Sequence, residues 1–300
     1  MQYHQSVLLK ESIAGLNIDP DGVYVDLTFG GGGHSEAIIE NLEDGHLYAF
    51  DQDKDAKSNA SKFENRSFTF VAANFRHLGR FLKLYQTGLV DGILADLGVS
   101  SYQFDQPNRG FSIRHQARLD MRMDQQQPLT ASKIINEYEP VQLKRIFSEY
   151  GEIRNTNRLT DAIVTGRSMK AVKTIDQLKE IIEPLAPRHR EFKYFAQVFQ
   201  ALRIEVNDEL SAIREMLVQA NEWLKPGGRL VCIAYHSLED RLIKNFMQKG
   251  NMEGKEEKDF YGNLLRPLEP VNRKPIMPSQ EEIEKNNRAR SARLRIAKKI

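Results

Sequence analysis

The fold of this chain is predicted best from the stretch Val23-Tyr-Val-Asp-Leu-Thr-Phe-Gly-Gly-Gly-Gly-His34. Its first five residues, Val23–Leu27, are mostly β-branched or aromatic, which is typical of a strand. The four glycines Gly30–Gly33 follow at once. Because glycine has no Cβ, the backbone there can adopt positive φ and approach a ligand closely. A glycine turn between a strand and a helix indicates a nucleotide-like ligand at the carboxyl edge of an α/β sheet.

The pattern around this turn is an alternation of short strands and helices. Apolar runs bounded by turn formers predict strands, and the segments between them have helical spacing. Such alternation predicts a mostly parallel, Rossmann-like α/β sheet with right-handed crossovers. We expect strands at 23–27, 46–50, 67–71, 92–97 and 229–235, and helices at 35–42, 54–63, 210–224 and 239–248.

The middle of the chain lacks strand signals. From Pro107 to Arg203 the spacing is helical, at 130–150, 158–166 and 174–184, with prolines as breakers. We therefore predict a discontinuous domain made of residues 1–106 and 204–300, interrupted by a helical insertion at 107–203. Residues 249–280 are polar and rich in proline, so we expect a long loop with one short strand.

Composition narrows the class of protein. With 40% hydrophobic and 28% charged residues, the sequence is that of an ordinary soluble protein. No apolar run approaches the roughly 18 residues of a membrane span, and the start of the chain lacks the apolar core of a signal peptide. The single cysteine, Cys232, excludes an internal disulfide and a cysteine metal cluster. We predict a cytoplasmic protein without a metal site.

The net charge of +2 is unevenly distributed. Residues 285–300 contain seven basic side chains and no acidic one. A basic terminal arm on a mildly acidic body suits contact with phosphates. A solvated helix end explains the same charges, and the sequence leaves the choice open.

Two cofactor classes use a glycine turn followed by an acid. A nicotinamide site needs G-x-G-x-x-G, but its sixth position is Ser35 when counted from Gly30 and Glu36 when counted from Gly31. S-adenosylmethionine sites are less strict: they need an acid at the end of the first strand, glycines that admit the amino-acid part, and an acid for the ribose hydroxyls. Asp26, Gly30–Gly33 and Asp51 suit these three roles, since a carboxylate accepts two hydroxyl donors. A structural turn with surface acids is the alternative.

The fourth and fifth predicted strands also end in candidate residues. Asp96 lies where an open α/β sheet faces its ligand, so it can contact the cofactor, the substrate or both; it can also cap the next turn. DNA amino-methyltransferases usually have Asp/Asn-Pro-Pro-aromatic here, whereas this chain has Asp96-Leu-Gly-Val. His236, after the fifth strand, is either a helix-capping neighbour or a substrate contact.

A further group of residues follows Asp96 in the chain. Arg109 and Arg122, with the aromatic residues Phe104 and Phe111, suit a flipped or single-stranded base through stacking and phosphate contact. Membership of a hydrophobic core is the alternative for the aromatic residues.

Together these segments resemble one family, the bacterial 16S ribosomal RNA (cytosine-N4)-methyltransferases. The stretch Arg188–Gln197 departs from the His-Pro-Ala-Thr-Arg-type lead-in that is common in that family. The similar segments occur in order along nearly the whole chain, at residues 4–9, 26–35, 51–53, 74–75, 91–105, 109–112, 119–124, 199–210, 225–230, 236–241 and 288–295.

The resemblance implies a class I S-adenosylmethionine-dependent methyltransferase fold with a helical insertion that helps to hold the substrate. It implies methylation of N4 of a specific cytidine near the decoding region of the small ribosomal subunit. Asp96 is our candidate for the hydrogen-bond acceptor of the amine, because it lies at the expected ligand edge of the sheet. The cofactor site that the resemblance implies is lined by Gly32, Gly33, His34, Asp51, Phe75, Asp96 and Gln103.

Two other functions are considered. One is a DNA amino-methyltransferase, which the missing Pro-Pro-aromatic turn disfavours. The other is a non-catalytic RNA-binding or ribosome-assembly factor, which the intact glycine run and both acids disfavour. The sequence leaves the oligomeric state open between a monomer and a homodimer.

Overall fold

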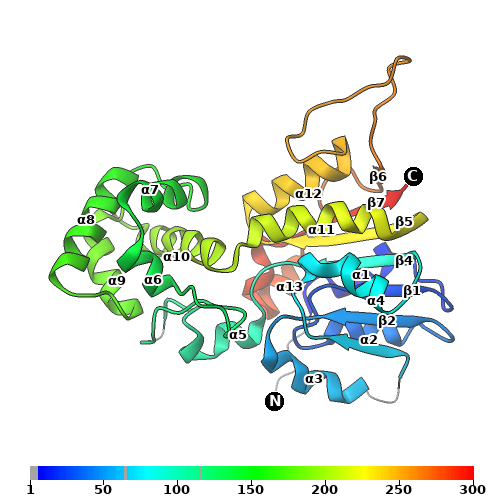
Figure 1. Cartoon of the computed structure of the whole chain (residues 1–300), viewed down its shortest axis with the longest axis horizontal. Helices are drawn as coiled ribbons and strands as arrows, with labels where there is room; N and C mark the ends of the chain where they lie inside the picture. Colours follow the sequence, from blue (N-terminus) through cyan, green and yellow to red (C-terminus); the bar gives the residue numbers. More distant parts are fainter. Residues whose placement is uncertain (1–5, 64–65, 115) are drawn as a thin grey trace. The chain divides into compact units, whose positions relative to one another are not determined.

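The computed structural model describes residues 6–63, 66–114 and 116–300. The chain forms two compact units (Figure 1). We call Met1–Gly98 with Leu210–Ile300 the sheet unit, and Val99–Glu209 the helical unit. His4, in the first family-like segment, lies outside the described residues. Within the described ranges, no helix is both long and apolar enough to cross a bilayer.

The sheet unit is built on seven strands in the order β3-β2-β1-β4-β5-β7-β6. The first five strands are parallel, and β7 is antiparallel to both of its neighbours. This confirms the predicted α/β class. The strand order reverses between β1 and β4, and such a switch point is where open α/β sheets bind ligands. The strands are β1 (Val23–Asp26), β2 (His46–Phe50), β3 (Phe68–Val71), β4 (Val90–Asp96), β5 (Leu224–Ala234), β6 (Leu268–Pro270) and β7 (Arg293–Lys299).

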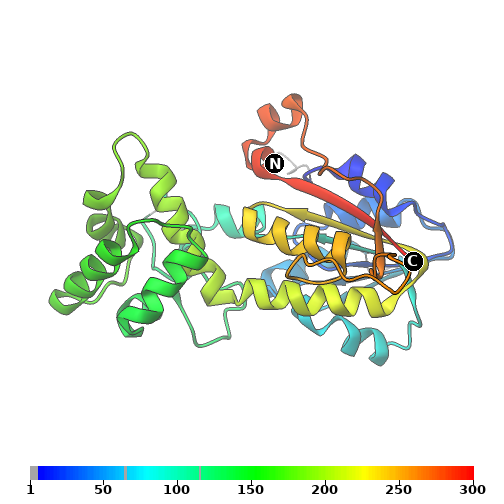
Figure 2. The ribbon, with the colours of Figure 1, turned by 90° about the horizontal axis from the view of Figure 1, so that it is seen from above.

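Helices cover both faces of this sheet. In Figure 2, α1 (Leu9–Leu16) and α2 (Gly33–Ile39) lie on one face, and α4 (Leu78–Leu84), α11 (Glu209–Trp223) and α12 (Ser237–Lys249) on the other. Strands buried on both faces are expected to be continuously apolar, and Ile93–Ala95 of β4 is fully buried. The short helices α3 (Lys57–Ala60) and α13 (Gln280–Lys285) complete the unit.

The helical unit has its own apolar core, which includes Phe147, Leu159 and Val198. Prolines stand at helix starts, as Pro140 does at the first position of α7, because the missing N–H has no partner there in any case. Its helices are α5 (Ser101–Asp105), α6 (Ala131–Glu137), α7 (Pro140–Glu149), α8 (Thr156–Met169), α9 (Ile175–Ile182) and α10 (Glu191–Asn207).

The C-terminal residues form a strand and not a basic arm. β7 lies between β5 and β6, and its residues Leu294, Ile296 and Ala297 are buried. The guanidinium of Arg295 is also buried and donates to the Asp240 carboxylate at 2.6 and 3.1 Å. Residues 293–299 are therefore neither an extended arm nor a helix end, the two alternatives that the sequence left open, because their alternating apolar residues place this segment in the sheet.

The Asp240–Arg295 pair generates a stability prediction. Burial by itself would raise the pKa of Asp240, but the hydrogen bonds and charges of Arg295 and Arg293 hold that pKa below its usual value. Asp240→Asn leaves the Arg295 charge buried without its partner, so we expect a loss of about 3–5 kcal/mol in the free energy of unfolding. Urea titration measures this loss. Lys298→Gln, an exposed position on the same strand, should change the free energy by less than about 0.5 kcal/mol. Equal effects of the two variants would contradict the assignment.

Candidate functional site

The four glycines of the turn after β1 differ in backbone conformation and in the space around them. Gly30 and Gly32 have φ values of 51° and 84°, in the left-handed region that favours glycine. A Cβ on Gly33 would lie 2.2 Å from Ser6 Oγ, whereas a Cβ on Gly31 would meet no atom within 4 Å. Gly32 is therefore favoured by its conformation, and a side chain at Gly33 would require the Ser6 hydroxyl to move. Gly31 borders open space that a ligand can occupy.

The Asp26 carboxylate stabilises this turn by hydrogen bonds. Its carboxylate accepts the Ser35 hydroxyl at 2.6 Å and the Thr28 N–H at 3.0 Å. Burial raises the pKa of Asp26, and the nearby His34 ring opposes that rise. Because the side chain is almost completely buried, Asp26 supports the turn and does not reach the open space beside Gly31.

Asp51 connects the glycine turn to the end of β2. Its two carboxylate oxygens accept the N–H groups of Gly30 and Asp53, each at 2.8 Å. Burial raises the pKa of Asp51 to about 6, although both amides lower it. A carboxylate offers about four acceptor sites, so these two bonds leave capacity for two hydroxyl donors.

Asp96, the last residue of β4, provides the third carboxylate at this edge. Its Oδ1 accepts the Tyr235 hydroxyl at 2.8 Å, and its backbone N–H donates to the Thr28 hydroxyl at 2.7 Å. Burial raises the pKa of Asp96 to about 6, while the His34 ring and the Tyr235 hydroxyl lower it. The side chain remains 21% exposed. Asp96 is therefore no helix cap, and it can still meet a ligand.

His34 lies beneath the same carboxylate. Its Nε2 is 3.1 Å from the Val7 carbonyl and its Nδ1 is 3.7 Å from Asp96 Oδ2. Since a carbonyl only accepts, Nε2 carries a proton. The other ring nitrogen, Nδ1, therefore faces the Asp96 carboxylate.

The other two predicted cofactor residues are placed differently. Phe75 begins a 3-10 turn after β3, which Asn74 caps, and Asn74 also donates to the Gln52 side chain at 2.7 Å. Gln103 is buried in the helical unit, where it forms a capping box with Ser100 at the start of α5. Six of the seven predicted residues thus lie in the sheet unit, and their role in binding stays a prediction.

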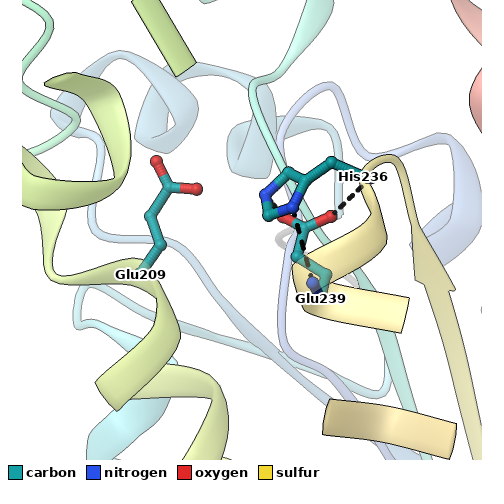
Figure 3. A group of neighbouring side chains, drawn as sticks. All are labelled: Glu209, His236 and Glu239. Carbon is teal, nitrogen blue, oxygen red and sulfur yellow. Dashed lines mark hydrogen bonds and ion pairs between the residues drawn. The ribbon is translucent and has the colours of Figure 1, made fainter. Parts of the chain in front are cut away.

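Tyr235, directly after β5, was not predicted to support the site. Tyr235 holds Asp96, and its N–H donates to the buried Glu239 carboxylate at 2.8 Å. His236 is the N-cap of α12, in a capping box with Glu239 (Figure 3). The capping alternative for His236 therefore accounts for its place in the fold. The only sequence signal for Tyr235 is its position directly after the strand that pairs with β4.

The residues that were predicted to contact a base form interactions within the helical unit. Arg109 is buried and donates to the carbonyls of Arg122 and Met123, each at 3.0 Å. Arg122 pairs with Asp120 at 2.7 Å, and Phe111 belongs to the core. The prediction that these side chains meet a base is wrong for Arg109 and Phe111, because their interactions are satisfied within the fold.

Comparisons with known proteins agree along the whole chain. The model of the MraW methylase family matches residues 1–300. The chain is 53% identical to a ribosomal RNA small subunit methyltransferase H of Amoebophilus asiaticus, over 99% of this chain and 96% of the relative. The protein of the same name from Bacteroides thetaiotaomicron is 55% identical, over 100% of this chain and 98% of the relative.

The raised pKa of Asp51 predicts a pH dependence of stability. A carboxyl whose folded pKa is raised binds its proton more tightly when folded, so the stabilisation is complete below about pH 4 and is lost as the pH rises to about 6. In ligand-free protein, Asp51→Asn removes this loss of stability with rising pH. We expect the variant to gain roughly 1–3 kcal/mol relative to the unaltered chain between pH 4 and pH 7. Urea unfolding at both pH values measures the difference. The exposed Asp44→Asn should show no such change.

Proposed function

This chain belongs to the MraW methylase family, and from that premise we propose that it transfers a methyl group from S-adenosylmethionine to N4 of a cytidine in small-subunit ribosomal RNA. The names of the relatives refer to the small-subunit RNA. The N4 position and the decoding region are more specific than those names and belong to this proposal. The observation that supports it best is the partly exposed Asp96 carboxylate at the switch point of the sheet.

The donor set beside the glycine turn fits this cofactor. The space next to Gly31 admits a ligand against the backbone. Asp51 retains acceptor capacity for the two ribose hydroxyls, and the charge of Asp96 is compatible with a nearby cation. When bound, S-adenosylmethionine supplies a methyl group activated by a sulfonium sulfur. Gly32, Gly33, His34 and Phe75 would complete the site in the sheet unit, while the role of Gln103 in cofactor binding stays a prediction from the sequence.

Asp96 is the residue that we propose acts on the amine. The lone pair of the cytosine amino group is delocalised into the ring, which makes the amine a poor nucleophile. A carboxylate that accepts a hydrogen bond from the N–H returns electron density to nitrogen. The raised pKa of Asp96, about 6 because of burial, makes it a stronger acceptor that is still ionised at pH 7. Tyr235 and His34 orient it, and orientation of reactants can contribute roughly 7–11 kcal/mol.

The two other functions are less well supported. A DNA amino-methyltransferase would be expected to have the Pro-Pro-aromatic turn after Asp96, and the similar relatives are named for ribosomal RNA. A non-catalytic assembly factor would not need open space at Gly31 together with two carboxylates of raised pKa. We further propose the assembled small subunit as the partner and the helical unit as a substrate-holding element.

Asp96→Asn tests the catalytic role. We expect the single-turnover rate at saturating cofactor to fall by about 10²–10⁴-fold, as is typical for loss of a positioned base. Labelled S-adenosylmethionine and small subunits that lack the modification provide the assay, with nucleoside analysis of the product. Tyr235→Phe is the comparison variant: it removes one donor to Asp96 and keeps the carboxylate, so it should lower the rate by less than Asp96→Asn does. An unchanged saturated rate with weakened cofactor binding would reduce Asp96 to a binding residue, and label on another base would overturn the proposed substrate.

Gly31→Ala tests the place of the cofactor. The added methyl group meets nothing in the ligand-free fold, so the free energy of unfolding should stay within about 0.5 kcal/mol. Cofactor affinity measured by calorimetry should fall at least about tenfold, because the methyl group occupies the ligand's space. Gly32→Ala, at φ 84°, should instead destabilise the fold by about 1 kcal/mol or more. Unchanged affinity in Gly31→Ala would place the ligand elsewhere.

A further inference from the structure

Two distant segments of the helical unit bring exposed cationic side chains together. Arg154 and Arg158 flank the start of α8, and the others flank the start of α10. All are exposed, and none has an ion pair or a side-chain hydrogen bond among the described residues. We define the basic patch as Arg154, Arg158, Arg188, Arg190 and Lys193 together with the aromatic Phe192.

The two segments are held against each other by direct contacts. The Asn155 side chain donates to the Leu185 carbonyl at 3.2 Å, and the Gln197 side chain donates to the Gly151 carbonyl at 3.0 Å. Ile153 belongs to the same buried core as residues of α10. The segment 185–197 therefore lies across 151–155, and the cations of both segments share one region of the surface.

Backbone electrostatics adds to these charges. α8 has 14 residues and α10 has 17, and neither has a side-chain hydrogen bond at its N-cap. Both helix starts therefore contribute partial positive charge at the patch. The acid nearest in sequence, Glu191, accepts the N–H of His189 at 2.9 Å. Residues 152–158 and 183–193 carry a net charge of +2 with histidine neutral.

Phe192 adds an exposed aromatic ring to the basic patch. Its side chain is 76% exposed, although it stands in the first turn of α10 next to buried core residues. It lies in sequence between Arg190 and Lys193. Cations that contact phosphates and an aromatic ring that stacks on a base are the combination by which proteins bind single-stranded RNA.

We propose that the basic patch binds a single-stranded stretch of the RNA substrate, with its cations on the phosphates and Phe192 stacked on a base. This inference rests on the proposed function, and it assigns substrate binding to a surface of the helical unit that family-like motifs do not cover. Charge complementarity favours RNA over a protein partner, since a polyanion matches unpaired cations.

A triple variant tests the electrostatic half. We expect Arg154→Gln/Arg190→Gln/Lys193→Gln to weaken binding of a 16S ribosomal RNA transcript about tenfold or more near physiological salt. The slope of log affinity against log salt should fall by about 2, for three lost phosphate contacts on a single strand. The control is Lys133→Gln/Lys170→Gln/Lys173→Gln. It removes the same charge from exposed positions near the other end of α8, about 20 Å away, and should keep the slope.

Phe192→Ala tests the stacking half. We expect about 5- to 150-fold weaker binding, which is the effect typical of one stacked base, with an unchanged salt slope. Val141→Ala, which removes another exposed apolar side chain (73%) from this unit, should bind as the unaltered chain does. All variants should keep the melting temperature and the cofactor affinity, since the altered side chains are exposed.

The outcomes separate this inference from the proposed function. Unaltered affinity and slope in the patch triple variant would overturn the inference, even if cytidine is methylated. An effect of Phe192→Ala without a slope change in the triple variant would indicate a base contact without phosphate contacts, and it would overturn the assignment of the cations to the phosphates. Patch-dependent RNA binding without any methyl transfer to cytidine would support the inference and refute the proposed function.

Discussion

Three carboxylates lie at adjoining strand ends of one sheet, and the arrangement around them depends on keeping them partly removed from water. Asp26 ends β1, between Asp51 after β2 and Asp96 at the end of β4. Burial raises the pKa of each, and the charge of Asp26 raises that of the other two further. Buried charge is tolerated only when it is hydrogen-bonded. The glycine turn, Ser35, Thr28, His34 and Tyr235 supply that compensation.

This constraint separates the roles of the three acids. Asp26 is almost completely buried, and its hydrogen bonds go to the turn that it supports. Asp51 and Asp96 are less buried and keep acceptor capacity beyond the bonds that hold them. A site of this kind holds its acceptors in place before a ligand arrives, so little reorganisation is needed during the reaction. Without a ligand, keeping these charges partly buried still has an electrostatic cost.

Sequence patterns predicted the five parallel strands of the sheet but not β7. β1 to β4 follow from apolar runs and turn formers, and the strand predicted at 229–235 is the second half of β5, which already begins at Leu224. β7 was missed because Arg293, Arg295 and Lys298 alternate with apolar residues, and this was interpreted as a charged tail. The pairing of Arg295 with Asp240, 55 residues away, makes that charge compatible with burial. Likewise, Arg109 was expected to face a base, but it donates to carbonyls 13 and 14 residues ahead.

The sequence by itself determined the α/β class, the glycine turn, the acids at the strand ends and the family, because these depend on local periodicity and on residue types at fixed spacing. Only the tertiary structure decided which side chains hold those acids, as Tyr235 holds Asp96 across 139 positions of sequence. It also assigned His236 to a helix cap, Arg295 to the sheet and the exposed cations around the starts of α8 and α10 to neighbouring segments. The physical reason is that desolvation and pairing depend on distance in space, which spacing along the chain does not fix.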